Sequence, residues 1–332
     1  MIVALFAFLT SFFIGMIVAP PIIALIKKAK AKQTILVYVE QHKDKVGTPT
    51  MGGLIFLISA ALSCLFFWQG EKRLALIALI VTFAYGLVGG LDDLIKVVFK
   101  RNLGLRPYQK IISQAAIAAL ATYFSYSSEY IGTAISLPFL HTTVELSYWY
   151  LPLCFIAYIA TTNCVNLTDG LDGLAGSTSA LYLAAFFTIA VFTFSSASDL
   201  GRTLYAEEVK NLAVFIAALI GGLIAFLWFN SHKAKIFMGD TGSLALGGAC
   251  AAVAIFMKNP LSILLVGISF VLSGISVIIQ VVVYKIKKRR VFLMAPLHHH
   301  LEMRGNSEAK IVSMYSIVTA IAGVVAVLGV LQ

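Results

Sequence analysis

Long apolar runs dominate this sequence and constrain its fold more than any other feature. The chain has 332 residues, of which 60% are hydrophobic and only 12% are charged. Many of the apolar runs approach or exceed the roughly 20 residues that a helix needs to cross a lipid bilayer. A soluble fold does not accommodate this composition, so the sequence predicts an all-α integral membrane protein.

We expect about ten membrane-spanning helices, each taken from an apolar run bounded by charged residues, Pro or Gly. The predicted spans are residues 2–26, 52–68, 74–91, 111–126, 148–160, 174–194, 212–229, 244–257, 261–284 and 311–331. The fifth and the eighth are shorter than a span requires, so each is expected to extend into the polar motif beside it. We expect the spans to form one domain over residues 1–332.

The distribution of basic residues predicts the orientation in the membrane. Only five of the 25 Lys and Arg residues fall in the even-numbered gaps between spans: Lys72, Arg73, Arg202, Lys210 and Lys258. The positive-inside rule therefore places the odd-numbered gaps in the cytoplasm and both termini outside. The net charge of +10 is explained by this face and its attraction to anionic membrane lipid, so no nucleic acid partner is required.

Five aspartates at the predicted cytoplasmic ends of spans are the leading candidates for chemistry: Asp92, Asp93, Asp169, Asp172 and Asp240. A carboxylate so close to hydrocarbon is costly unless it is paired or ligated. The alternative interpretation is that each one caps a helix or pairs with a nearby Lys, and Asp240, just before an apolar run, suits an N-cap. Three acidic segments on one membrane face favour a functional site over capping alone.

These residue types suit a hard divalent cation. Mg²⁺ binds carboxylates together with substrate phosphates and water, and it neutralises charge during phosphoryl transfer. Neighbouring residues on a helix diverge by about 100°. We therefore expect that Asp92 and Asp93 cannot both face one point and that they have different roles.

The motif NCVNLTDGLDGLAG places oxygen-bearing side chains at every third position: Asn163, Asn166, Asp169 and Asp172. On a regular helix the first and last of these, nine positions apart, would lie on opposite sides. The glycine that follows each aspartate allows the helix to end and the backbone to approach a ligand. We expect the helix to bend or tighten here, so that successive oxygens surround a polar ligand.

Two further loops contain candidate anion-binding groups. The loop HKDKVGTPTMGG combines Lys45 and Thr50 with a Gly-Pro turn that could hold a phosphate, although it lacks the GxxxxGK[ST] pattern of a P-loop. The segment MAPLHHHLE carries His298, His299 and His300. Three adjacent histidines cannot all reach one metal from regular backbone, so we assign them to anion contact or substrate shaping before zinc.

Five segments resemble the motif set of the phospho-N-acetylmuramoyl-pentapeptide transferases, a branch of the polyprenyl-phosphate N-acetylhexosamine-1-phosphate transferases. In chain order they are KDKVGTPTMGG, GGLDDLIK, NCVNLTDGLDGLAG, FNSHKAKIFMGDTGSLALGG and MAPLHHHLE. The resemblance extends over essentially the whole chain. The forms GTPTMGG and MAPLHHH are similar to the muramoyl branch, and they differ from relatives that use N-acetylglucosamine donors.

The resemblance implies a Mg²⁺-dependent enzyme that transfers phospho-N-acetylmuramoyl-pentapeptide from UDP-MurNAc-pentapeptide to undecaprenyl phosphate. The products are UMP and lipid I, in the first membrane step of peptidoglycan synthesis. The family works in the bacterial cytoplasmic (inner) membrane, with the active site facing the cytoplasm, and forms homodimers. Carried over by motif, the resemblance assigns catalysis to Asp92, Asp93 and Asp240, metal binding to Asp240 and Asp169, and substrate binding to Lys45, Thr50, Asn163, Asn166, Asp172, Asn230, His298, His299 and His300.

Two mechanisms and two other functions stay open at this point. The lipid phosphate could attack directly while Asp92 orients it or removes its last proton, or Asp92 could form a covalent aspartyl-phosphate. A sibling transferase would use a different UDP-sugar. A cation transporter would also use intramembrane aspartates, but it should place them near mid-span and not at span ends.

Overall fold

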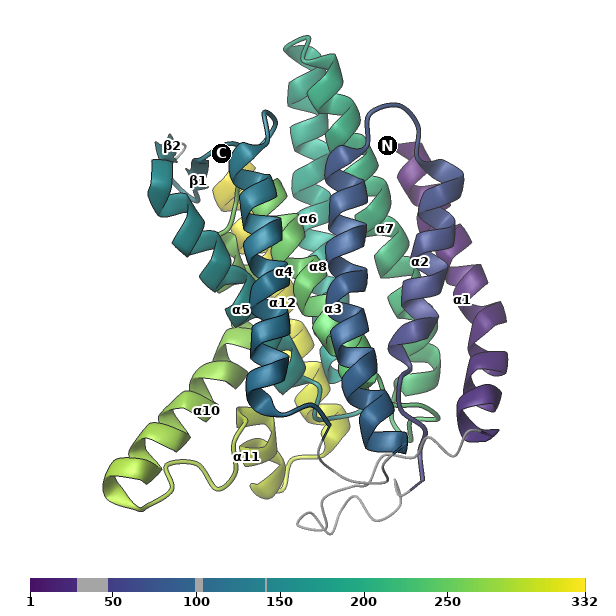
Figure 1. The fold of residues 1–332 in the computed structure, drawn as a ribbon, viewed down its shortest axis with the longest axis vertical. Coiled ribbons are helices and arrows are strands. Elements are labelled where there is room, and N and C mark those ends of the chain that lie inside the picture. Colours follow the sequence, from purple (N-terminus) through teal and green to yellow (C-terminus); the bar gives the residue numbers. More distant parts are fainter. Residues whose placement is uncertain (29–46, 99–103, 141, 332) are drawn as a thin grey trace.

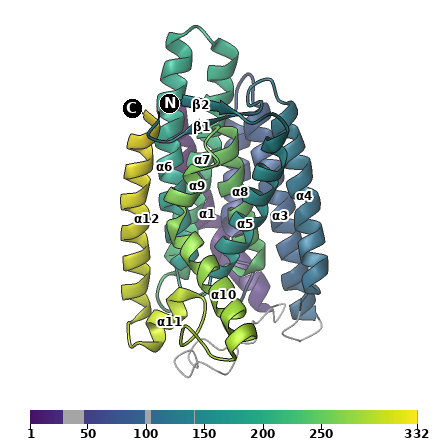
Figure 2. The same ribbon diagram turned by 90° about the vertical axis from the view of Figure 1, so that its left-hand side faces the viewer.

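The computed structural model shows long helices packed side by side, with both chain termini at the same end of the bundle (Figure 1). It describes residues 1–28, 47–98, 104–140 and 142–331. A small antiparallel sheet of β1 (Ala134–Leu137) and β2 (Thr142–Glu145) lies at the end that carries the termini (Figure 2). The helices are α1 (Ile2–Lys28), α2 (Gly53–Phe67), α3 (Arg73–Val98), α4 (Pro107–Ser127), the 3-10 turn η2 (Ser147–Trp149), α5 (Tyr150–Thr168), α6 (Leu174–Asp199), α7 (Thr203–Asn230), α8 (Gly239–Phe256), α9 (Ser262–Val266), α10 (Ile268–Lys287), α11 (Leu297–Met303) and α12 (Glu308–Leu331).

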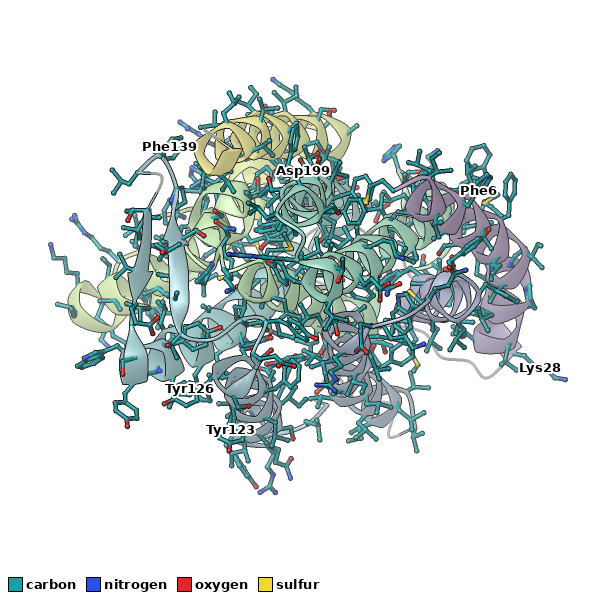
Figure 3. The ribbon with its side chains drawn as sticks, turned by 90° about the horizontal axis from the view of Figure 1, so that it is seen from above. Phe6, Lys28, Tyr123, Tyr126, Phe139 and Asp199 are labelled. Carbon is teal, nitrogen blue, oxygen red and sulfur yellow. The ribbon has the colours of Figure 1, made fainter. Side chains whose placement is uncertain are left out.

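Eight helices of the described chain are long and apolar enough to cross a membrane, namely α1, α3, α5 with η2, α6, α7, α8, α10 and α12. Large apolar side chains cover their outer surface, and Phe6 and Tyr123 are visible on the periphery in Figure 3. The prediction of an all-α integral membrane protein is confirmed. Each of the ten predicted spans overlaps a helix, but α2 has only 15 residues and α4 is not among the eight. The number of spans and their orientation therefore stay predictions.

The two short predicted spans do extend into their polar motifs. α5 continues to Thr168 and so includes Asn163 and Asn166, and α8 begins at Gly239 and includes Asp240 in its first turn. Candidate site residues therefore lie on the ends of membrane helices and not on long loops.

Close packing of α3 against α8 brings two of the acidic segments together. Among the eight candidate spans of the described chain, α8 is the most enclosed, with 89% of its residues buried inside the bundle. A side chain at Gly89 of α3 would collide with the main chain of Asp240 and Thr241 on α8. Small residues permit such an approach between membrane helices. The carboxyl-terminal end of α3 therefore lies directly against the first turn of α8.

α10 differs from the other long helices because it leans away from the bundle (Figure 1). The helix is interrupted at Gly267, which lies between the short α9 and α10. After α10 the chain turns back to α11, which contacts both α10 and α12. This return brings the three histidines of α11 toward the end of the bundle that carries the aspartates.

Candidate active site

Three carboxylates meet where α3 ends and α8 begins. One oxygen from each of Asp92, Asp93 and Asp240 lies within 4.8 Å of the other two. The expectation that Asp92 and Asp93 cannot both face one point was wrong. Adjacent side chains leave a helix about 100° apart, yet both carboxylates approach Lys96, one turn later. The Lys96 Nζ is 2.6 Å from Asp92 and 3.9 Å from Asp93.

The two neighbouring aspartates are nevertheless held by different parts of the chain. Asp92 accepts the main-chain N–H of Leu105 at 2.8 Å, in the segment that leads to α4. Asp93 accepts the N–H of Thr241 at 2.9 Å and its hydroxyl at 2.7 Å, both from α8. The different surroundings agree with the expectation of different roles.

Asp240 is the centre of an ionic network. Its Oδ2 lies 3.0 Å from the Nζ of Lys96 and 3.0 Å from that of Lys110, while Asn166 donates to its Oδ1 at 2.8 Å. Sequence reasoning singled out neither lysine. Lys96 had a usable signal, because it follows Asp92 by four residues and Asp93 by three on one helix. Lys110 had none, since only the packing of α4 brings it to Asp240.

The donor set of this group fits a hard cation. All three residues offer carboxylate oxygens, and oxygen ligands are those that Mg²⁺ and similar divalent cations prefer. The three carboxylates could therefore hold a metal ion. In this structure Lys96 and Lys110 neutralise the charge of Asp240.

Asp169 does not belong to this group of three. It caps the carboxyl-terminal end of α5 and is half-buried. Burial, together with the nearby carboxylates of Asp240, Asp93 and Asp172, raises the pKa of Asp169 to about 8. At neutral pH this carboxyl group holds a proton unless a cation comes close, so its charge depends on what occupies the acidic centre.

The polar stripe that contains Asp169 does not continue as a helix. α5 ends at Thr168, and Gly173 adopts a φ of +79°, a left-handed conformation that favours glycine, before α6 begins. The expected break in the helix is confirmed. The side chains of the polar stripe contact different elements. Asn163 donates to Gln114 of α4 at 2.7 Å, whereas Asp172 accepts the N–H of Ala234 at 3.1 Å.

Asn230 and Thr50 lie deeper in the structure than a simple substrate-contact role suggests. The buried Asn230 accepts the N–H of Gly173 at 3.0 Å and donates to the main-chain oxygen of Ile236 at 2.9 Å, which joins the α5–α6 turn to the loop before α8. Thr50 is also buried, and its hydroxyl borders Gly239 beside Asp93. Lys45 lies outside the described residues.

The three histidines of α11 have different partners. His298 is fully buried, its Nε2 faces Gly170, and neither ring nitrogen has a hydrogen-bond partner within the described chain. Burial, followed by the neighbouring His299, lowers the pKa of His298 to about 3. His299 pairs with Glu302 at 3.0 Å, and His300 accepts the N–H of Leu293 at 3.1 Å. None of the three belongs to a group of three potential metal ligands in the described residues.

A second cluster lies beside a pocket of about 710 Å³. Asp172, His232 and Glu308 bring their ligand atoms within 4.8 Å of one another, and His232 and Glu308 line the pocket. Sequence reasoning missed both of the latter residues. His232 and Glu308 are 76 positions apart, so only the fold brings them together.

The fold and the site together define a multi-pass membrane protein with an acidic, lysine-bridged centre at the ends of its helices. Residues 74–258 match the glycosyl transferase family 4 model, and residues 45–57 match phospho-N-acetylmuramoyl-pentapeptide-transferase signature 1.

Similar proteins named phospho-N-acetylmuramoyl-pentapeptide-transferase occur in several clostridia. The Clostridium kluyveri protein is 43% identical over 318 residues, which is 96% of each chain. The Clostridium perfringens SM101 protein is 44% identical over 316 residues, covering 95% of this chain and 93% of that one. The Clostridium novyi protein is 40% identical, covering 96% and 94%. The chain belongs to the phospho-N-acetylmuramoyl-pentapeptide-transferase family and is a phosphoglycosyl transferase, which confirms the resemblance that its motifs indicated.

Proposed function

We propose that this enzyme transfers phospho-N-acetylmuramoyl-pentapeptide from UDP-MurNAc-pentapeptide to undecaprenyl phosphate, giving lipid I and UMP. The named relatives, at 40–44% identity, support this substrate pair. One observation carries the proposal beyond the names. Asp92, Asp93 and Asp240 meet Lys96 and Lys110 in one place, so that ligands for a cation and donors for phosphate oxygens share a site.

The proposed cofactor is Mg²⁺, held by Asp240 with Asp169 nearby. Asp240 is the best candidate because it is the member of the acidic group that both lysines and Asn166 contact. When bound, Mg²⁺ would stabilise the negative charge that develops on the donor diphosphate. A cation there would also favour the charged form of Asp169, whose pKa of about 8 reflects burial and neighbouring negative charge.

Lys96 and Lys110 are proposed to bind the phosphates of the donor. Both ammonium groups now neutralise Asp240 at 3.0 Å. A divalent cation on the same carboxylate would take over that neutralisation. The ammonium groups could then contact phosphate oxygens at small cost, because they need only exchange one anionic partner for another.

Asp92 is proposed to orient the lipid phosphate or to accept its last proton. The second pKa of a phosphate monoester is about 6, so the acceptor is largely dianionic at neutral pH and can attack the donor directly. An oxygen of the lipid phosphate then bonds to the sugar-linked phosphorus, and the bond from that phosphorus to UMP breaks. Asp92 is held at both oxygens, by Leu105 and by Lys96, which suits a positioning group better than an attacking one.

We also propose that the protein lies in the bacterial cytoplasmic membrane as a homodimer, with the acidic centre facing the cytoplasm. The odd-numbered gaps between the predicted spans are rich in Lys and Arg, which supports this orientation through the positive-inside rule. Membrane lipid would then surround the apolar outer faces of the helices.

The decisive experiment measures UMP and lipid-linked product from purified protein in nanodiscs. UDP-MurNAc-pentapeptide and undecaprenyl phosphate should give both products with Mg²⁺ and neither after chelation. Parallel reactions contain UDP-GlcNAc as donor, or omit the lipid acceptor. Product with UDP-GlcNAc but not with UDP-MurNAc-pentapeptide would indicate a sibling transferase. The absence of product from every donor would reject the proposed reaction.

A further inference from the structure

Gln280 is a half-buried polar residue of α10, a helix whose outward-facing side chains in this part are apolar and exposed. Its neighbour Ile278 is 63% exposed, and Ile286 further along is 74% exposed. A side-chain amide in such surroundings is costly unless the protein satisfies its hydrogen bonds. The Gln280 Oε1 accepts the N–H groups of Val291 and Phe292, both at 3.0 Å, and its Nε2 donates to the Phe292 oxygen at 3.1 Å. The amide therefore anchors the segment that follows α10 through three hydrogen bonds.

The anchored segment in turn controls the ring of His300. The N–H of Leu293 donates to the His300 Nδ1 at 3.1 Å, and the Phe292 ring packs edge-on against the imidazole at 5.5 Å between centroids. Because Nδ1 accepts this bond, the ring proton of His300 lies on Nε2. One tautomer and one ring orientation are thus fixed by residues that Gln280 holds in place.

A second contact closes the same segment at its other end. The N–H of Leu297 donates to the hydroxyl of Ser276 on α10 at 2.9 Å. Gln280 and Ser276 lie four positions apart, so one face of α10 holds both ends of the chain from residue 291 to residue 297. This anchoring resists rotation of the segment that carries the His300 partner.

We propose that Gln280 is a positioning residue for the transfer reaction and acts through His300. By holding Phe292 and Leu293, it keeps the His300 Nε2–H available as a donor to an anionic oxygen of the substrate. The inference rests on the proposed function, because it needs a phosphate-bearing substrate to receive that donor. It assigns to the membrane helix α10 the control of a histidine on α11.

The test compares Gln280 variants in two backgrounds. Gln280→Ala should lower kcat/KM about 10-fold, the size of coupling expected inside one hydrogen-bond network. Gln280→Glu keeps an acceptor for the two N–H groups and should recover most of that loss. In a His300→Ala background, Gln280→Ala should have no further effect. Ile278→Ala, a truncation on the same helix, is the matched control and should leave kcat/KM unchanged.

Additive losses in the double variant, or no loss from Gln280→Ala, would overturn the proposal. Histidine ring ¹⁵N spectra supply a measurement that does not depend on catalysis, with His300→Ala used for assignment. The wild type should show His300 protonated at Nε2, and Gln280→Ala should show a mixture of tautomers. If the wild type makes no product, the proposed function fails while these spectra still test the anchoring. Gln280→Met replaces Gln280→Ala if the latter does not fold.

Discussion

The two ends of α3 both contact buried carboxylates that accept main-chain N–H groups, but only one end adds lysine side chains to these partners. At the end near the termini, Glu208 of α7 is fully buried and accepts the N–H groups of Arg73 and Leu74 at 2.9 and 2.8 Å. Nearby, Asn211 binds main-chain atoms of Gln69 and Glu71. At the opposite end, Asp92 and Asp93 also accept main-chain N–H groups, but they additionally share the side-chain ammonium group of Lys96 with Asp240 of α8.

This difference separates a structural acid from a functional one. Main-chain N–H groups are fixed by the fold, and at the first turn of a helix they also favour negative charge, so Glu208 is satisfied wherever the protein is folded. Lysine side chains can leave one anion for another without unfolding anything. Buried acids at membrane helix ends therefore indicate chemistry most strongly when their partners include mobile charged side chains.

The largest expected effect distinguishes Asp240, at the acidic centre, from Glu208, at the opposite end of the bundle. Asp240→Asn should abolish transfer at ordinary Mg²⁺ while the protein stays folded, because the amide keeps the shape but loses the charge that would hold the cation. Glu208→Gln should retain turnover but lower the free energy of unfolding by about 1–3 kcal/mol, because a buried hydrogen-bond network is disturbed. Transfer activity per folded protein measures the first effect, and thermal unfolding in detergent measures the second. Near-normal transfer by Asp240→Asn would remove its proposed ligand role.

The next largest effect concerns Asp92, within the acidic centre itself. If it orients or deprotonates the lipid phosphate, Asp92→Asn should lose about 10²–10⁴ in rate and recover part of it as the pH rises past about 6. Solvent then performs the deprotonation. The direct route would be contradicted by a phosphorylated Asp92 trapped from donor alone, together with UMP release that needs no lipid.

Much of this picture could be predicted from sequence because it depends on local patterns. Apolar runs predict the helices, and the aspartates at the ends of α3, α5 and α8 predict where polar chemistry gathers. The convergence of Asp92 and Asp93 could not be predicted, since their angular separation on the helix hides how far a carboxylate reaches. Lys110 and Glu208 were missed for another reason. Their partners are 130 and about 135 residues away, and only helix packing brings them together.

A smaller effect compares basic residues at the two ends. Lys110 is mostly buried against Asp240, whereas Arg73 forms a solvent-exposed pair with Glu129 at 3.6 Å. Lys110→Gln should lower kcat/KM about 10-fold to 100-fold, because a charge-assisted bond to phosphate is lost. Arg73→Gln should change neither activity nor stability measurably, as exposed ion pairs contribute little. Initial rates measured across donor concentrations give kcat/KM for both variants. Equal activity of the two variants would contradict phosphate binding by Lys110.

The smallest expected effect is a pH dependence of stability that His298 causes at the aspartate-bearing end of the bundle. Burial lowers the pKa of His298 to about 3, from the unfolded value of about 6.5. Below pH 6.5 the unfolded chain therefore takes up a proton that the folded protein excludes, and stability falls as the pH falls. His298→Gln lacks this proton uptake. Between pH 6.5 and 5.5 the wild type should lose about 1 kcal/mol of unfolding free energy relative to the variant. Denaturant unfolding of both proteins in detergent at the two pH values measures this difference.

Glu208→Gln is the control from the opposite end, and it should follow the wild type across the same interval because it keeps His298. Parallel curves for wild type and His298→Gln would mean that His298 is not held neutral inside the fold.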